Sequence, residues 1–224
     1  MNQWKTLPKK ITEAANAEET VKERKRKGNG ILAELTTLLN DIPLGNKRTR
    51  VGLELWHAMF LNGALFNSET WTGLIQKDIS QLEVIDHKIL RVITGAHSKV
   101  PLEMLYLETG KMDISSVMSV RRVLYWHNIK RRHKKELISQ VYNAMKSKPV
   151  KGDWINLVKA DLDKFNMTIE NETQFMQMKK EDFKSMIKQK ARYACFEKIE
   201  KLKDSYSKLN ICATQEITKH KNTW

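Results

Sequence analysis

The chain contains few of the residue patterns that perform catalysis or hold a metal ion. No two of its six histidines have the i, i+4 spacing of ligands on one helix face, and Cys195 and Cys212 form no C-x-x-C sequence. It has no glycine-rich phosphate loop, nucleophile elbow or H-E-x-x-H sequence. Helix capping and the helix dipole explain the acidic pairs at positions 161/163 and 181/182. The sequence therefore predicts no metal, no cofactor and no catalytic site.

Positive charge is the chemistry that the sequence does carry. Forty Lys and Arg residues against 26 Asp and Glu give a formal net charge of +14, which favours nucleic acid as partner, and an acidic membrane surface second. Any single basic cluster can be an ordinary solvated face, but three together favour phosphate contacts. The candidate nucleic-acid-binding residues are a first cluster of Lys22, Arg24, Lys25, Arg26 and Lys27, a middle cluster of Arg121, Arg122, Lys130, Arg131, Arg132, Lys134 and Lys135, and a C-terminal cluster of Lys180, Lys184, Lys188 and Arg192.

Two aromatic residues, Tyr125 and Trp126, lie beside the middle cluster and have two interpretations. Exposed rings next to cations can stack on nucleic-acid bases. Rings that follow Leu124 on a helix more often belong to the apolar core, and the core interpretation is favoured here.

The composition predicts an all-α fold. Nine Gly and four Pro in 224 residues are too few for a turn-rich β-protein, and helix-forming residues dominate. We expect an irregular bundle of about seven to nine helices, as one unit or as two helical subdomains: a loose arm (1–17), a helical bundle (18–148), a C-terminal subdomain (149–209) and a tail (210–224). The sequence has no transmembrane run or secretory signal, and its two cysteines favour an intracellular location, nuclear or cytoplasmic.

Local signals predict where several helices begin and end. The sequence GNG at 28–30 predicts a break, a kink or a cap in the first helix, and a mostly apolar helix follows over about 47–66. Pro101 suits the first position of a helix, and Asp113 and Asp153 suit N-caps. A last long helix, about 181–206, is expected to bury one face made of Phe183, Ile187, Ala191, Ala194 and Leu202.

Several segments, in their order and spacing, resemble one known family. The sequences LNGALFNSETWTGL, QLEVIDHKILRVITG, PLEMLYLETG, RRVLYWHNI and KGDWINLVKADL are similar to the region that follows the polymerase palm in non-LTR (LINE-type) retrotransposon reverse transcriptases. The similarity extends from about Glu18 to Leu209. In that family this region is the helical thumb and the segment beyond it, which hold the template–primer duplex. The resemblance also implies that FNSETW lies in a packed helix–helix junction anchored by Trp71.

The chain departs from this family in ways that limit the expected function. The paired-aspartate sequence F/Y-x-D-D that holds the polymerase metal ions is absent, as are the fingers and palm, an endonuclease signature and a zinc knuckle. We therefore expect a non-catalytic fragment that grips RNA or an RNA–DNA duplex by its backbone, with the missing palm and fingers as a further partner. The alternatives are a helical protein-interaction module, a decayed retroelement fragment without activity and, more distantly, a membrane-surface binder.

Overall fold

The computed structural model describes residues 17–201, except 75, 149–152 and 168–171. These residues form nine α-helices and no strand, which confirms the predicted all-α fold. The predicted tail and all but the last residue of the predicted arm lie outside the described residues. In chain order the elements are α1 (Ala17–Asn40), α2 (Asn46–Leu55), the π-helix η3 (Trp56–Ala64), the 3₁₀-helix η4 (Ser68–Thr70), α3 (Gln76–Thr94), α4 (Leu102–Thr109), α5 (Ile114–Lys130), α6 (Leu137–Ser147), α7 (Trp154–Lys164), α8 (Glu172–Gln177) and α9 (Lys180–Lys201).

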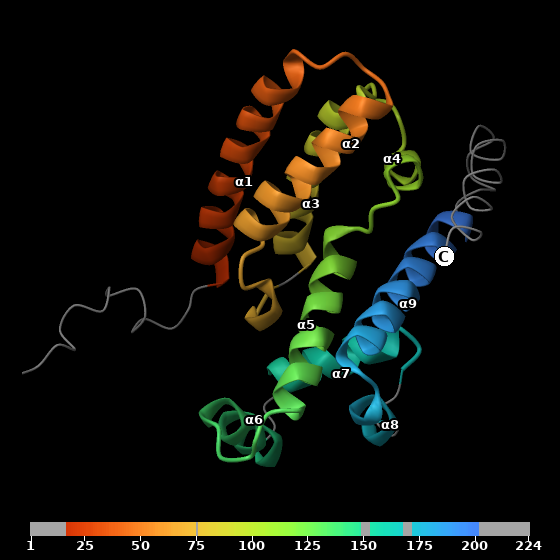
Figure 1. Ribbon diagram of the computed structural model, residues 1–224. Coiled ribbons are helices and arrows are strands. Elements are labelled where there is room, and N and C mark those ends of the chain that lie inside the picture. The colour runs from red at the N-terminus through yellow and green to blue at the C-terminus, as the bar shows by residue number, and fades with distance from the viewer. Residues whose placement is uncertain (1–16, 75, 149–152, 168–171, 202–224) are drawn as a thin grey trace, which may run out of the picture.

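Helix α5 connects two groups of helices (Figure 1). On one side α1, α2 with η3, and α3 pack together, and α4 packs on α3. On the other side α6, α7, α8 and α9 pack on α5. The start of α5, with Ile114 and Val117, belongs to the first apolar core, whereas Val123 and Trp126 belong to the second. The predicted subdomain boundary at 149 stays a prediction, since residues 149–152 lie outside the described residues.

Helix α1 runs without interruption through the GNG sequence, so the expected break or cap at this point is wrong. A β-carbon on buried Gly28 would lie 3.2 Å from Ile85 of α3 and 3.3 Å from Phe60 of η3. The glycine therefore serves close packing between helices, which offsets its poor helix propensity.

The helix expected over 47–66 changes its hydrogen-bonding pattern half-way along. It is α-helical up to Leu55 and a π-helix from Trp56 to Ala64. Trp56 is buried and donates a hydrogen bond of 2.6 Å from its indole Nε1 to Oδ1 of Asp86, which is also buried. Because π-helical segments often occur at functional sites, the exposed side of η3 is a candidate position for a site.

The predicted helix ends are largely confirmed. The side chains of Asp113 and Asp153 accept hydrogen bonds from the backbone N–H groups three residues later, at 2.6 and 2.8 Å. Helix α4 begins at Leu102, one residue later than predicted, with Pro101 as its N-cap. Phe183, Ile187 and Ala191 of α9 are buried as expected and Ala194 is half-buried, whereas Leu202 lies outside the described residues.

The segment after η3 is packed, but Trp71 is not its anchor. Trp71 is only partly buried at the edge of the first core, with the Arg24 guanidinium 5.7 Å from its ring centroid. Ser68 is fully buried, and η4 packs on α5. The indole Nε1 of Trp154 also donates a 2.7 Å hydrogen bond to the Glu69 carbonyl. These contacts correct the prediction for Trp71, and Trp56 is the core tryptophan of this region.

Candidate nucleic-acid interface

Arg121 of the middle cluster is committed to contacts inside the protein. Its guanidinium donates hydrogen bonds to the carbonyl oxygens of Leu65 at 2.7 Å and Leu61 at 2.9 Å, at the end of η3. Burial lowers the pKa of Arg121. Arg121 therefore ties α5 to the end of the π-helix, which corrects the prediction that it contacts phosphate.

Arg122 is excluded from any surface by its burial. Its side chain is 9% exposed and forms a 2.6 Å ion pair with Asp161 of α7. Asp161 was expected to act through helix capping, but it lies in the second half of α7 and serves as this buried counter-ion. An arginine enclosed in this way holds two helices together and cannot reach a nucleic-acid backbone, so this member of the predicted set is also corrected.

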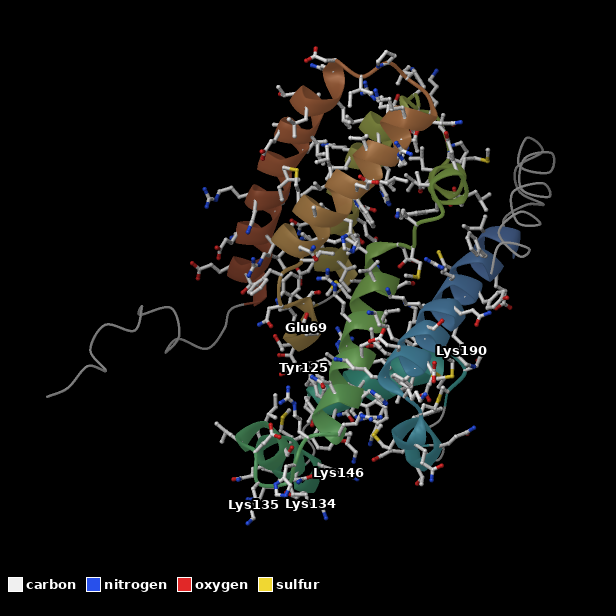
Figure 2. The ribbon with its side chains drawn as sticks, viewed as in Figure 1. Glu69, Tyr125, Lys134, Lys135, Lys146 and Lys190 are labelled. Atoms are coloured by element: carbon white, nitrogen blue, oxygen red, sulfur yellow. The ribbon has the colours of Figure 1, made fainter. Side chains whose placement is uncertain are left out.

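The remaining cations of the middle cluster divide into paired and free side chains. Lys130 pairs with Glu172 at 2.5 Å, Arg131 donates to the Met178 carbonyl at 2.7 Å, and Arg132 pairs with Glu136 at 3.4 Å. Within the part of the chain that the structure describes, two members of the cluster, Lys134 and Lys135, are exposed and form no hydrogen bond or ion pair through their side chains. Figure 2 shows them at one end of the molecule together with Lys146, an exposed lysine of α6. We call Lys134, Lys135 and Lys146 the tip lysines.

The two aromatic residues beside this cluster belong mainly to the interior. Trp126 is buried and donates a hydrogen bond of 3.3 Å from its indole Nε1 to the Tyr142 hydroxyl. Tyr125 is half-buried and packs edge-on against Trp154, with ring centroids 5.8 Å apart. The core interpretation of Trp126 is confirmed, and this ring is not available to stack on a base.

The first cluster lies on α1, on the other side of α5 from α9 (Figure 1). Arg24 is half-buried against Trp71, and Lys25 donates a 3.4 Å hydrogen bond to Gln81 of α3. Lys22, Arg26 and Lys27 are exposed. The three sequence clusters therefore do not form one continuous patch.

The cations of the C-terminal cluster form one row along α9. Lys180, Lys184, Lys188 and Arg192 recur every four residues, the spacing that places side chains on one helix face; we call them the α9 track. The pKa of Lys188 is lowered by partial burial and then by the positive charges of Lys184 and Arg192. The buried residues Phe183, Ile187 and Ala191 face the second core. Helix α9 thus buries one apolar side against the second core, and the α9 track lies along one edge of that side, about 100° further round the helix.

Other positive residues continue this face beyond both ends of the α9 track. Arg192 lies close enough to Lys111, between α4 and α5, to lower its pKa together with burial. At the other end the pKa of buried His127 is lowered mainly by burial, and the positive charges of Arg131 and Lys180 lower it further. Lys111 could not be selected from the sequence, because it is an isolated lysine between Gly110 and Met112.

The described residues contain no group of three His, Cys, Asp or Glu side chains placed to hold a metal ion. None of the described helices is long and apolar enough to span a bilayer. No known family model, curated protein or solved structure matches the chain. The resemblance to LINE-type reverse transcriptases therefore stays a prediction.

Proposed function

We propose that this protein binds the phosphate backbone of nucleic acid along the α9 track and performs no catalysis by itself. The observation that carries the proposal is the row of four cations, spaced four residues apart, along a helix whose adjacent side is fixed in the second core. A net charge of +14 supports a polyanionic partner. Contacts of this kind position a nucleic acid but read no bases.

The dimensions of the α9 track suit a nucleic-acid backbone. The distance from Lys180 to Arg192 is 12 helical steps of about 1.5 Å each, or about 18 Å along the helix axis. Double-stranded nucleic acid carries about one charge per 1.7 Å of axis, so several phosphates lie within reach of this length. Helix positions four apart place their cations at intervals of about 6 Å, so the α9 track can contact several phosphates along one groove edge.

The family resemblance refines the proposal. On this basis the protein is a thumb-like module of a retroelement that grips RNA or an RNA–DNA duplex, in the nucleus or cytoplasm, together with a palm and fingers that this chain lacks. A module of this kind holds the duplex and leaves polymerisation to the palm. We therefore expect the isolated chain to extend no primer, with magnesium or with manganese.

Binding to a labelled RNA–DNA duplex at several salt concentrations tests the proposal. Each neutralised phosphate contributes about 0.9 to the slope of log K against log salt, so three to four contacts predict a slope of about −3 to −4. Unrelated duplex sequences should give the same affinity within about twofold, because phosphates carry no base information. A slope near zero would contradict backbone binding and favour the protein-interaction alternative.

A further inference from the structure

An open hollow of about 570 Å³ lies where α2 and the start of η3 meet the connection between α4 and α5. Its wall is formed by Arg50, Leu53, Glu54, His57 and Lys111. A volume of this size is in the range of small-molecule sites. His57, the second residue of the π-helix, therefore lines this hollow.

Two cations, Arg50 and Lys111, and the His57 ring line the hollow. Arg50 and His57 are exposed, and Lys111 is half-buried. Among the residues that the structure describes, none of the three forms a hydrogen bond or ion pair through its side chain; the Lys111 ammonium lies only against the Trp56 ring, 5.3 Å from its centroid. Glu54 is the one carboxylate of the wall. The hollow therefore holds two cationic side chains against one carboxylate, and the His57 ring adds a hydrogen-bond donor.

Lys111 is the cation of the hollow that is least exposed to water. Burial and the nearby charge of Arg192 both lower its pKa, so the structure holds this cation in a position that disfavours its charge. Partly buried charges are normally paired, and the contact with Trp56 replaces only part of the lost hydration. A bound anion would provide the counter-ion and would also offset the repulsion from Arg192.

We infer that this hollow binds a phosphate group between Arg50, His57 and Lys111. A phosphate offers several acceptor oxygens to the donors that line this hollow from α2, η3 and the α4–α5 connection. Leu53 provides an apolar surface beside it for the attached sugar or base. The phosphate can belong to the end of a nucleic-acid strand that follows the α9 track through Arg192, or to a free nucleotide. This inference goes beyond backbone binding, since it requires only the phosphate group.

The test compares three single-stranded RNA dodecamers of one sequence, with a 5′-phosphate, with a 3′-phosphate and with hydroxyls at both ends. We expect one terminal phosphate to strengthen binding about tenfold, the effect of one or two hydrogen bonds between charged groups. In the double variant Arg50→Gln/His57→Gln this advantage should fall below about twofold. The variant Lys134→Gln/Lys135→Gln removes the same type of charge at the tip and should keep the advantage. Circular dichroism and thermal unfolding check that both variants are folded.

In a second experiment inorganic phosphate alone is titrated into the protein, and the His57 ring resonances are followed by NMR. Shifts that saturate with phosphate and disappear in Arg50→Gln would support the site and assign it to free phosphate, even if no dodecamer binds. Equal binding of all three dodecamers together with no response to inorganic phosphate would overturn the inference. In that case salt-dependent binding of the dodecamers would leave the proposed function intact, so the two failures are distinguishable.

Discussion

Helices α5 and α9 both carry a dense series of cations, but the fold treats these cations in opposite ways. On α5, Arg121 bonds to carbonyls of η3 and Arg122 pairs with Asp161 inside the protein. On α9, the cations flank the buried residues Phe183 and Ile187 at the edge of the solvent-facing side, and Lys184 pairs with the exposed Glu181. Charge density in the sequence therefore does not show which cations remain available to a ligand.

The physical difference is the number of sides on which each helix is covered. Helix α5 packs against η4, α3, α6, α7, α8 and α9 and contributes to both apolar cores, so even its arginines face other helices. Helix α9 packs mainly along α5 and leaves one side to solvent. The enclosed charges of α5 should therefore affect stability, whereas the solvent-facing charges of α9 should affect ligand binding.

Removing an enclosed charge should have the largest effect. Arg122→Met leaves Asp161 buried without a counter-ion, which costs about 3–5 kcal/mol of unfolding free energy. Urea unfolding measures this loss, and the double variant Arg122→Met/Asp161→Leu should recover most of it because no buried charge remains. A single variant within about 0.5 kcal/mol of the parent would contradict the enclosure of Arg122.

Within the described residues, the buried Asp86 carboxyl receives one hydrogen bond, from Trp56, and forms no ion pair. Its burial raises its pKa from 3.8 to about 7. Between these values the unfolded chain loses the proton while the folded protein keeps it, so stability falls as pH rises, by up to about 4 kcal/mol. Urea unfolding at pH 4 to 8 should show that Asp86→Asn removes this loss, whereas Asp163→Asn at an exposed position does not.

His87 acts in the opposite direction and must be separated from Asp86. Burial, followed by the charge of Arg91, lowers its pKa from 6.5 to about 4. Between these values the unfolded chain binds the extra proton, so this residue makes stability rise with pH. The prediction for Asp86 therefore concerns the difference between parent and variant, and an identical pH profile in Asp86→Asn would contradict it.

Arg121 should have a smaller effect on stability than the buried ion pair. Arg121→Met removes hydrogen bonds to two carbonyls of the π-helix, and a charged hydrogen bond contributes about 1.5–3 kcal/mol. We expect a loss of about 2–3 kcal/mol in urea unfolding, with an unchanged salt dependence of duplex binding. A flatter salt slope without loss of stability would instead return Arg121 to the nucleic-acid interface.

The sequence predicted the parts of the fold that depend on local signals. The caps at Asp113 and Asp153 follow from residue type and position, and the buried face of α9 follows from its period. The π-helix and the continuity of α1 at Gly28 depend on neighbouring helices, which a local pattern does not contain.

The candidate sites were predictable only in part, for the same reason. The α9 track was selected from its four-residue spacing, and the structure retains that spacing on one face. The enclosure of Arg122 depends on α7, 39 residues later in the chain, and Lys111 gains its environment from Arg192. Such contacts between distant segments have no signature in the sequence around either residue.

The most direct test compares two sets of lysines that carry the same charge. Both Lys180→Gln/Lys184→Gln/Lys188→Gln on α9 and Lys134→Gln/Lys135→Gln/Lys146→Gln at the tip remove three lysines, and neither should change stability by more than about 0.5 kcal/mol. Figure 2 shows the tip lysines at the far end of α5, away from Lys190 on α9.

The measurement is the log–log salt slope of binding to one RNA–DNA duplex for the parent and both variants. We expect the α9 variant to flatten the slope by about 2–3, at roughly 0.9 per lost phosphate contact. The tip variant should change the slope by less than about 1. An equal flattening in both variants, or a larger one in the tip variant, would contradict the assignment of the nucleic-acid interface to α9.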